Sequence, residues 1–224
     1  MLAPMPTPVL IETGSKKVFA SALAWPGWSR SGRDEAAALE ALAAYAARYA
    51  PVALDAGFRF GPRVAASLDV VERLPGSGAI DFGVPDGVAV ADRSPLTKKD
   101  AARFVALVEA AWAYLDSVAA GAPGVLRKGP RGGGRDRDQI VQHVVSAEAA
   151  YGRAIGVRHK EPDAGDGDAV RALRADIVAT LAGARSGAPL AGRSWPARYA
   201  ARRIAWHALD HAWEIEDKSE PAKN

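Results

Sequence analysis

Cysteine is absent from this chain of 224 residues. Its absence excludes disulfide bonds, thiolate metal ligands and catalysis by a cysteine nucleophile. Any thiol chemistry would therefore need a thiol that a cofactor or a substrate supplies.

Long apolar runs are also lacking, and we expect no stretch that is long enough to span a bilayer. The first eight residues, MLAPMPTP, have neither the basic region nor the apolar stretch of a signal peptide. The sequence therefore predicts a soluble, cytoplasmic protein with no membrane partner.

A strong excess of one charge is lacking too. The chain has 29 lysines and arginines against 26 aspartates and glutamates, which gives a net charge of +3. The basic residues are scattered apart from one loop, so no nucleic-acid partner is expected. Hydrophobic residues make up 49% of the chain, which is enough for a large core. The many alanines, glycines and arginines are typical of a GC-rich bacterial genome.

Residues 1–94 have the pattern of a small α/β domain. Two β-prone runs, residues 9–13 and 17–23, flank Gly14-Ser15, which predicts a hairpin. An alanine- and leucine-rich stretch predicts one helix over residues 34–50, ended by Pro51. The other expectations are breaks at 25–28 and 31–32, a strand at 67–74, an extended piece at 80–83 and a linker at 85–95.

Residues 95–224 have the pattern of a four-helix bundle. Apolar residues repeat at helical spacing from Thr97, which forms a capping-box pattern with Asp100. Further helices are expected at residues 136–155, around residues 170–181, and from Ser194 onward. The predicted fold class is therefore α+β, with a C-terminal four-helix bundle after the small α/β domain.

Three of the four histidines lie on the predicted inner faces of two helices. His207 and His211 are spaced i, i+4, so their rings share one helix face, and His143 lies on the helix over residues 136–155. Neutral imidazole binds zinc, nickel and similar divalent ions, and three protein ligands leave one coordination position open. The pattern predicts a metal site; the alternative is three core histidines, each satisfied by a hydrogen bond.

Three acidic residues, Glu148, Asp210 and Glu214, lie close to these histidines in the sequence. Carboxylates often orient metal-binding imidazoles. Asp210, however, points about 100° away from His211 around the helix. We therefore expect all three to form salt bridges, at the surface or between helices.

The only basic cluster is the loop over residues 127–137, which leads into the His143 helix. Its Arg131 and Arg135, together with backbone amides at the helix start, are candidates to bind a substrate carboxylate or phosphate. The loop lacks the Lys-Ser/Thr ending of a P-loop. The other interpretation is a solvated loop without a ligand.

Trp206 and Trp213 flank the histidine pair, seven residues apart on the last predicted helix. Both are expected to pack against neighbouring helices or against the N-terminal domain. They are also candidates for the wall of an apolar substrate pocket.

The segments IVQHVVSAE (140–148) and IAWHALDHAWE (204–214) resemble the DinB/YfiT-like superfamily of metalloenzymes. The resemblance covers roughly residues 97–219, with one histidine on the second helix and an HxxxH pair on the fourth. It implies that His143, His207 and His211 bind a divalent metal, with zinc and nickel as the first candidates. Members include transferases and isomerases that use mycothiol, bacillithiol or glutathione, and their bundles often pair, which implies a homodimer.

A second resemblance lies in the N-terminal segment. The run VFASALAWPGWSRSGRDEAAAL, residues 18–39, is similar to the HicB-like antitoxin fold, in which a strand and a Pro-Gly turn precede a helix. It implies a small α/β fold. The DNA-binding appendage that HicB proteins often carry is not visible, so no antitoxin function is inferred.

These observations lead to the hypothesis of a metal-dependent enzyme that acts on a small-molecule substrate. It would be a transferase or isomerase that uses a low-molecular-weight thiol such as mycothiol, or a hydrolase. One alternative is a non-enzymatic protein-binding protein with a degenerate bundle. The other is a sensor that holds an apolar small molecule between Trp206 and Trp213.

Overall fold

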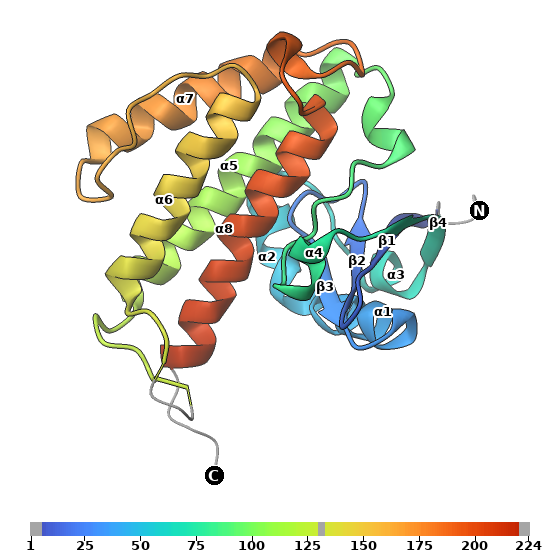
Figure 1. The fold of residues 1–224 in the computed structure, drawn as a ribbon, viewed down its shortest axis with the longest axis horizontal. Coiled ribbons are helices and arrows are strands. Elements are labelled where there is room, and N and C mark those ends of the chain that lie inside the picture. The colour runs from blue at the N-terminus through green and yellow to red at the C-terminus, as the bar shows by residue number, and fades with distance from the viewer. Residues whose placement is uncertain (1–5, 130–132, 220–224) are drawn as a thin grey trace.

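Strands come first along the chain and long helices follow (Figure 1). The structure is a computed structural model that describes residues 6–129 and 133–219. Within these residues it contains eight α-helices and a mixed four-stranded sheet. At this level the predicted mixture of a small sheet and long helices is confirmed.

The sheet has the strand order β3-β2-β1-β4. Its strands are β1 (Thr7–Thr13), β2 (Val18–Ala22), β3 (Ser29–Gly32) and β4 (Leu68–Pro75). The strand β2 is antiparallel to both β1 and β3, whereas β4 is parallel to β1. The N–H of Gly14 donates to the carbonyl of Lys17 at 2.9 Å, which confirms the predicted hairpin. The predicted break at residues 31–32 is wrong, because both residues pair with β2.

The helix α1 (Glu35–Ala44) covers one face of the sheet and contacts β2 and β3. It begins at Asp34, whose carboxylate accepts a hydrogen bond from the N–H of Ala37 at 2.8 Å. Such a cap satisfies one of the free N–H groups at the helix start. The helix ends at Tyr45 and not at Pro51, so the predicted single helix over residues 34–50 is wrong.

The helix α2 (Ala46–Asp55) follows directly and contains Pro51. Proline removes one helical hydrogen bond, here the one to the carbonyl of Ala47. Both Ala47 and Pro51 are exposed, so water can bind that carbonyl in place of the missing N–H. The proline is therefore tolerated inside the helix, where the sequence predicted an end.

The connection from β4 to the long helices is more regular than the sequence predicted. It contains α4 (Gly78–Asp81) and a 3₁₀-helix, η1 (Val90–Arg93). A further short helix, α3 (Pro62–Ala66), lies before β4. Ser77 starts α4 by accepting a hydrogen bond from the N–H of Ala79 at 3.0 Å. The extended piece predicted at residues 80–83 is therefore wrong, and the predicted linker at 85–95 includes η1.

The second part of the chain forms four long helices, as predicted. They are α5 (Lys98–Gly121), α6 (Arg137–Ala154), α7 (Gly167–Gly183) and α8 (Ala197–Ser219), with a 3₁₀-helix η2 (Leu190–Gly192) before α8. The capping box at the start of α5 is confirmed. The side chain of Thr97 accepts from the N–H of Asp100 at 3.0 Å, and Asp100 accepts from the N–H of Thr97 at 3.2 Å.

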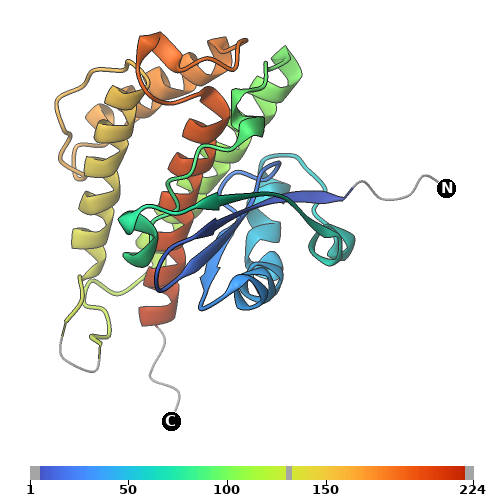
Figure 2. The same cartoon turned by 45° about the vertical axis from the view of Figure 1, so that its right-hand side comes forward.

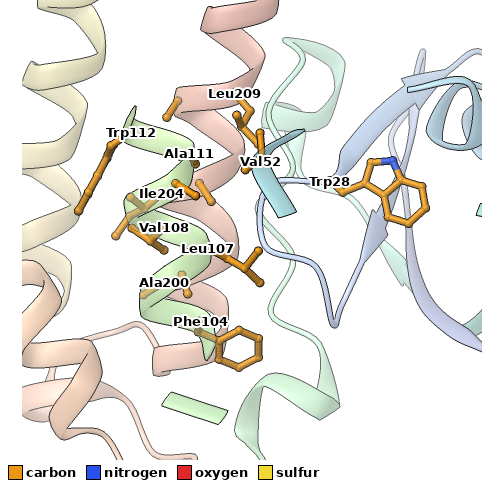
Figure 3. Packing of buried hydrophobic residues seen from close by; sticks show 14 of the residues in the cluster. Trp28, Val52, Phe104, Leu107, Val108, Ala111, Trp112, Ala200, Ile204 and Leu209 are labelled. Atoms are coloured by element: carbon orange, nitrogen blue, oxygen red, sulfur yellow. The ribbon is translucent and has the colours of Figure 1, made fainter. Parts of the chain in front are cut away.

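The helix α8 lies between the sheet and the other long helices (Figures 1 and 2). The helices α5 and α6 run beside it, and α7 packs against α5 and α6. The apolar face of α5 meets that of α8 through Leu107, Val108, Ala200 and Ile204 (Figure 3). This packing places the inner stripe of α8, including its two histidines, opposite α6.

The helix α5 is an exception to the expectation that no apolar stretch is long enough to span a bilayer. By length and composition alone, this 24-residue helix would be able to do so. Its apolar residues Phe104, Leu107, Val108 and Leu115 are instead buried in the protein core. This is the usual behaviour of a central helix in a folded domain, so the pattern does not by itself indicate a membrane segment.

The sheet and the long helices share one hydrophobic core. The largest cluster of buried residues includes Val9 and Ile11 of β1 together with residues of α5, α6, α7 and α8. Gly27 adopts φ +93°, and a Cβ atom there would meet the Cδ1 of Leu209 at 2.6 Å. Glycine is therefore required where the turn after β2 approaches α8. The boundary between domains near residue 94 stays a prediction.

Candidate metal centre

His143, His207 and His211 come together between α6 and α8. Their ring centroids are 5.1 Å apart for His143 and His207, 5.0 Å for His143 and His211, and 4.7 Å for His207 and His211. Each ring offers a nitrogen that lies within 4.8 Å of the other two. The predicted convergence of the three rings is therefore confirmed.

This spacing is close to that of a metal centre. A point equidistant from three atoms 4.8 Å apart lies about 2.8 Å from each, whereas zinc–imidazole bonds are about 2.0–2.1 Å. Ring movements of less than about 1 Å would bring all three nitrogens to bonding distance. An imidazole set with no thiolate suits zinc, nickel or copper better than magnesium or calcium.

The surroundings of His143 and His207 favour neutral imidazole, which is the form that binds metal. Burial lowers the pKa of His207 well below its usual value, and the nearby charge of His211 adds to this effect. Burial also lowers the pKa of His143, again with a contribution from His211. His207 and His211 are buried, whereas His143 is half-buried. A ligand from solvent would therefore approach on the His143 side.

The Nδ1 of His207 is the one buried ring nitrogen of the three histidines without a hydrogen-bond partner among the described residues. Four other buried side-chain atoms there also have none, three of them tryptophan N–H groups. An unpaired buried polar atom destabilises a fold by about 1–3 kcal/mol. A cation bound to this nitrogen would offset that penalty. The donor set and the unpaired atom together fit a divalent metal.

Glu214 holds the ring of His211. Its carboxylate lies 2.7 Å from the Nδ1 of His211 and also pairs with Lys218. The hydrogen bond to His211 is the main reason why the pKa of Glu214 falls to about 2. An ionised Glu214 favours the tautomer with a proton on Nδ1, which leaves the Nε2 of His211 free to bind a metal.

The predicted salt bridges of the three acidic residues are confirmed. Asp210 pairs with Arg30 at 2.9 Å, Glu148 pairs with Arg174 at 2.9 Å, and Glu214 pairs with Lys218. Glu214 also contacts the ring of His211, which is the orienting arrangement that the sequence favoured less. The i, i+3 spacing of His211 and Glu214 on one helix allows this contact.

Replacing Glu214 with alanine is expected to weaken metal binding about 10- to 100-fold. The ring of His211 would lose the carboxylate that sets its orientation and its tautomer. Metal affinity can be measured by competition with a chromophoric chelator. Asp210→Ala is the matched control, because Asp210 pairs with Arg30 and not with a ring. Equal affinities in the two variants would contradict the role of Glu214.

The four residues predicted to bind substrate differ in their exposure to solvent and in what they contact. Arg131 lies outside the described residues. Arg135 is exposed, and its charge is close enough to lower the pKa of both His143 and His207. Trp206 and Trp213 are 4% and 1% exposed. As expected, both pack against the N-terminal segment. That either tryptophan lines a substrate pocket stays a prediction.

The contacts of the two tryptophans explain their burial. Trp206 meets the ring of Phe19 on β2 edge to face, with 6.2 Å between centroids. Trp213 meets Tyr45 between α1 and α2, with 5.1 Å between centroids. The two indoles therefore attach α8 to the N-terminal elements, on the side away from α6.

Three residues that sequence reasoning did not assign to the site extend it along α6 and α8. The ring of Tyr151 lies 5.6 Å from that of His207, and the ring of Trp195 lies 5.1 Å from that of Tyr151. Arg203 lies 5.3 Å from the centre of the Tyr151 ring. Their spacing in the sequence could have indicated this, because Tyr151 follows His143 by eight residues and Arg203 precedes His207 by four. Residues four or eight apart lie close to the same face of a helix.

Comparison with known proteins adds no relative. No protein-family model matches the chain, and no significant match is found among curated proteins or solved structures. The site must therefore be interpreted from its own chemistry.

Proposed function

We propose that the protein is a metal-dependent enzyme of the DinB type, in which His143, His207 and His211 bind one divalent ion, zinc or nickel. The observation that carries this proposal is the set of three ring nitrogens within 4.8 Å of one another. The unpaired nitrogen of His207 and the contact from Glu214 to His211 support it. The four helices α5 to α8 would then correspond to the bundle of that superfamily.

Each residue of the centre has a distinct part in this proposal. His207, deep between the helices, anchors the ion, and Glu214 keeps the neighbouring ring in place. His143, half-buried, borders the side from which a substrate enters. With three protein ligands, a divalent ion keeps an open position, where it lowers the pKa of a bound water or thiol toward neutrality.

The absence of cysteine limits how a thiol reaction could proceed at this site. A thiol reaction would need a low-molecular-weight thiol such as mycothiol as a second substrate, because the chain has no thiol of its own. Transfer or isomerisation with such a thiol is the proposed activity, and hydrolysis by bound water is the second candidate. The buried, unpaired ring nitrogen disfavours the alternative of three core histidines that are each satisfied by a hydrogen bond.

Untagged protein purified without chelators is expected to contain close to one zinc or nickel ion per chain. Three imidazoles with one oriented by a carboxylate should retain such an ion through purification. Elemental analysis of the protein, before and after dialysis against metal-free buffer, measures this directly. Protein without metal that also fails to take up added Zn²⁺ or Ni²⁺ would disprove the metal centre.

A further inference from the structure

Arg203 lies one helical turn from His207 on the same face of α8. Its guanidinium carbon is 4.7 Å from the centre of the Trp206 ring and 5.3 Å from that of Tyr151. One of its nitrogens donates to the carbonyl of Pro85 at 3.3 Å. These contacts hold a half-buried guanidinium beside the candidate metal centre, and they leave its other N–H groups available.

The charge of Arg203 has no carboxylate partner within residues 6–129 and 133–219. The acids closest to the histidines are already paired, Asp210 with Arg30 and Glu214 with Lys218. The positive charges of Arg203 and Arg135 both act on the ring of His207. A divalent ion at the three rings would add two further positive charges, so this side of the site has a strong excess of positive charge.

Such an excess is typical of a site that binds an anion. The planar guanidinium of arginine matches the two oxygens of a carboxylate, and its hydrogen bonds to a charged acceptor are stronger than those between neutral groups. The rings of Tyr151 and Trp195 border the same region and would cover the apolar part of a small ligand.

We propose that Arg203 binds a carboxylate of the substrate, so that the enzyme acts on small organic anions whose reacting end reaches the metal. Arg135 adds positive charge at the entrance. This inference rests on the proposed metal centre and defines its substrate class. Arg203 would position the substrate, and the metal would contact the reacting end.

The test compares two thiols of equal length on protein loaded with Co²⁺ in place of the native ion. Both 3-mercaptopropionate and 3-mercapto-1-propanol can bind the metal through sulfur, which produces a cobalt–thiolate absorption band that reports binding. Only the first carries a carboxylate. Wild-type protein is expected to bind 3-mercaptopropionate at least about tenfold more tightly.

Variants of Arg203 assign the preference to that side chain. In Arg203→Met the preference is expected to fall to about onefold, and in Arg203→Lys part of it should remain because the charge is kept. Arg153→Met is the matched control, since Arg153 is an exposed residue of α6 and its loss changes the net charge equally. The Co²⁺ content of each variant verifies that the centre is intact.

The outcomes separate the two proposals. If wild-type protein does not bind Co²⁺, the metal centre is wrong and this inference is wrong with it. If Co²⁺ binds but the two thiols bind equally well, or if Arg203→Met keeps the preference, then only the carboxylate site is wrong. A preference lost in Arg203→Met and kept in Arg153→Met supports it.

Discussion

Purified His207→Ala protein is expected to contain almost no divalent metal, whereas the wild-type protein is expected to contain about one ion per chain. Removing one of three protein ligands should weaken binding roughly a thousandfold, because each ligand contributes several kcal/mol to the affinity for zinc. Elemental analysis gives the content, and competition with a chelator gives the Kd.

Two further variants make this experiment specific. His143→Ala removes a proposed ligand that is only half-buried, so it should repeat the loss of metal with less disturbance of the core. His159→Ala removes the fourth histidine, whose ring lies 2.8 Å from the carboxylate of Asp176 and outside the cluster. Normal metal content is expected in His159→Ala. Unchanged content in both His207→Ala and His143→Ala would disprove the assignment of the ligands.

The largest effect on stability is expected for Asp92→Ala. Asp92 of η1 and Arg202 of α8 form a buried ion pair, with the carboxylate accepting from Arg202 at 3.1 and 2.5 Å and from the N–H of Ala89 at 2.8 Å. Their exposed fractions are 2% and 6%. Removing Asp92 leaves the buried charge of Arg202 without its carboxylate partner in the ion pair, which lowers the free energy of unfolding by about 3–5 kcal/mol.

Urea denaturation of the variants measures this change. The double variant Asp92→Ala/Arg202→Met is expected to recover only part of the loss. It removes the charge left unpaired by Asp92→Ala, but it also removes the positive charge that acts on the buried Glu12. Glu35→Ala breaks the exposed pair between Glu35 and Arg73, at 2.8 Å, and should change stability little. If Asp92→Ala were as mild as Glu35→Ala, the ion pair would not stabilise the contact between η1 and α8.

The long helices could be predicted from the sequence because their signals are local. Periodic apolar residues and a capping box defined α5, and the same periodicity placed Val170, Leu173, Ile177 and Leu181 on the buried face of α7. Errors arose where the local signal was ambiguous. Pro51 normally ends a helix, but its exposed position lets α2 continue, and residues 80–83 gave no clear period.

The ambiguity of short segments was resolved by contacts from distant parts of the chain. Ile80 is buried against Phe19 and Trp206, which come from β2 and α8. The helix α4 therefore depends on partners that are 61 and 126 residues away in the sequence. A prediction that uses only neighbouring residues has no access to such contacts.

For the candidate site, the sequence by itself determined that His207 and His211 share a face, because the geometry of one helix requires it. The absence of cysteine likewise determined that no thiolate could join them. Only the tertiary structure decided that His143 approaches this pair and that Arg203 and Tyr151 border the centre. These relations depend on how α6 packs against α8, and such packing is set by the whole core.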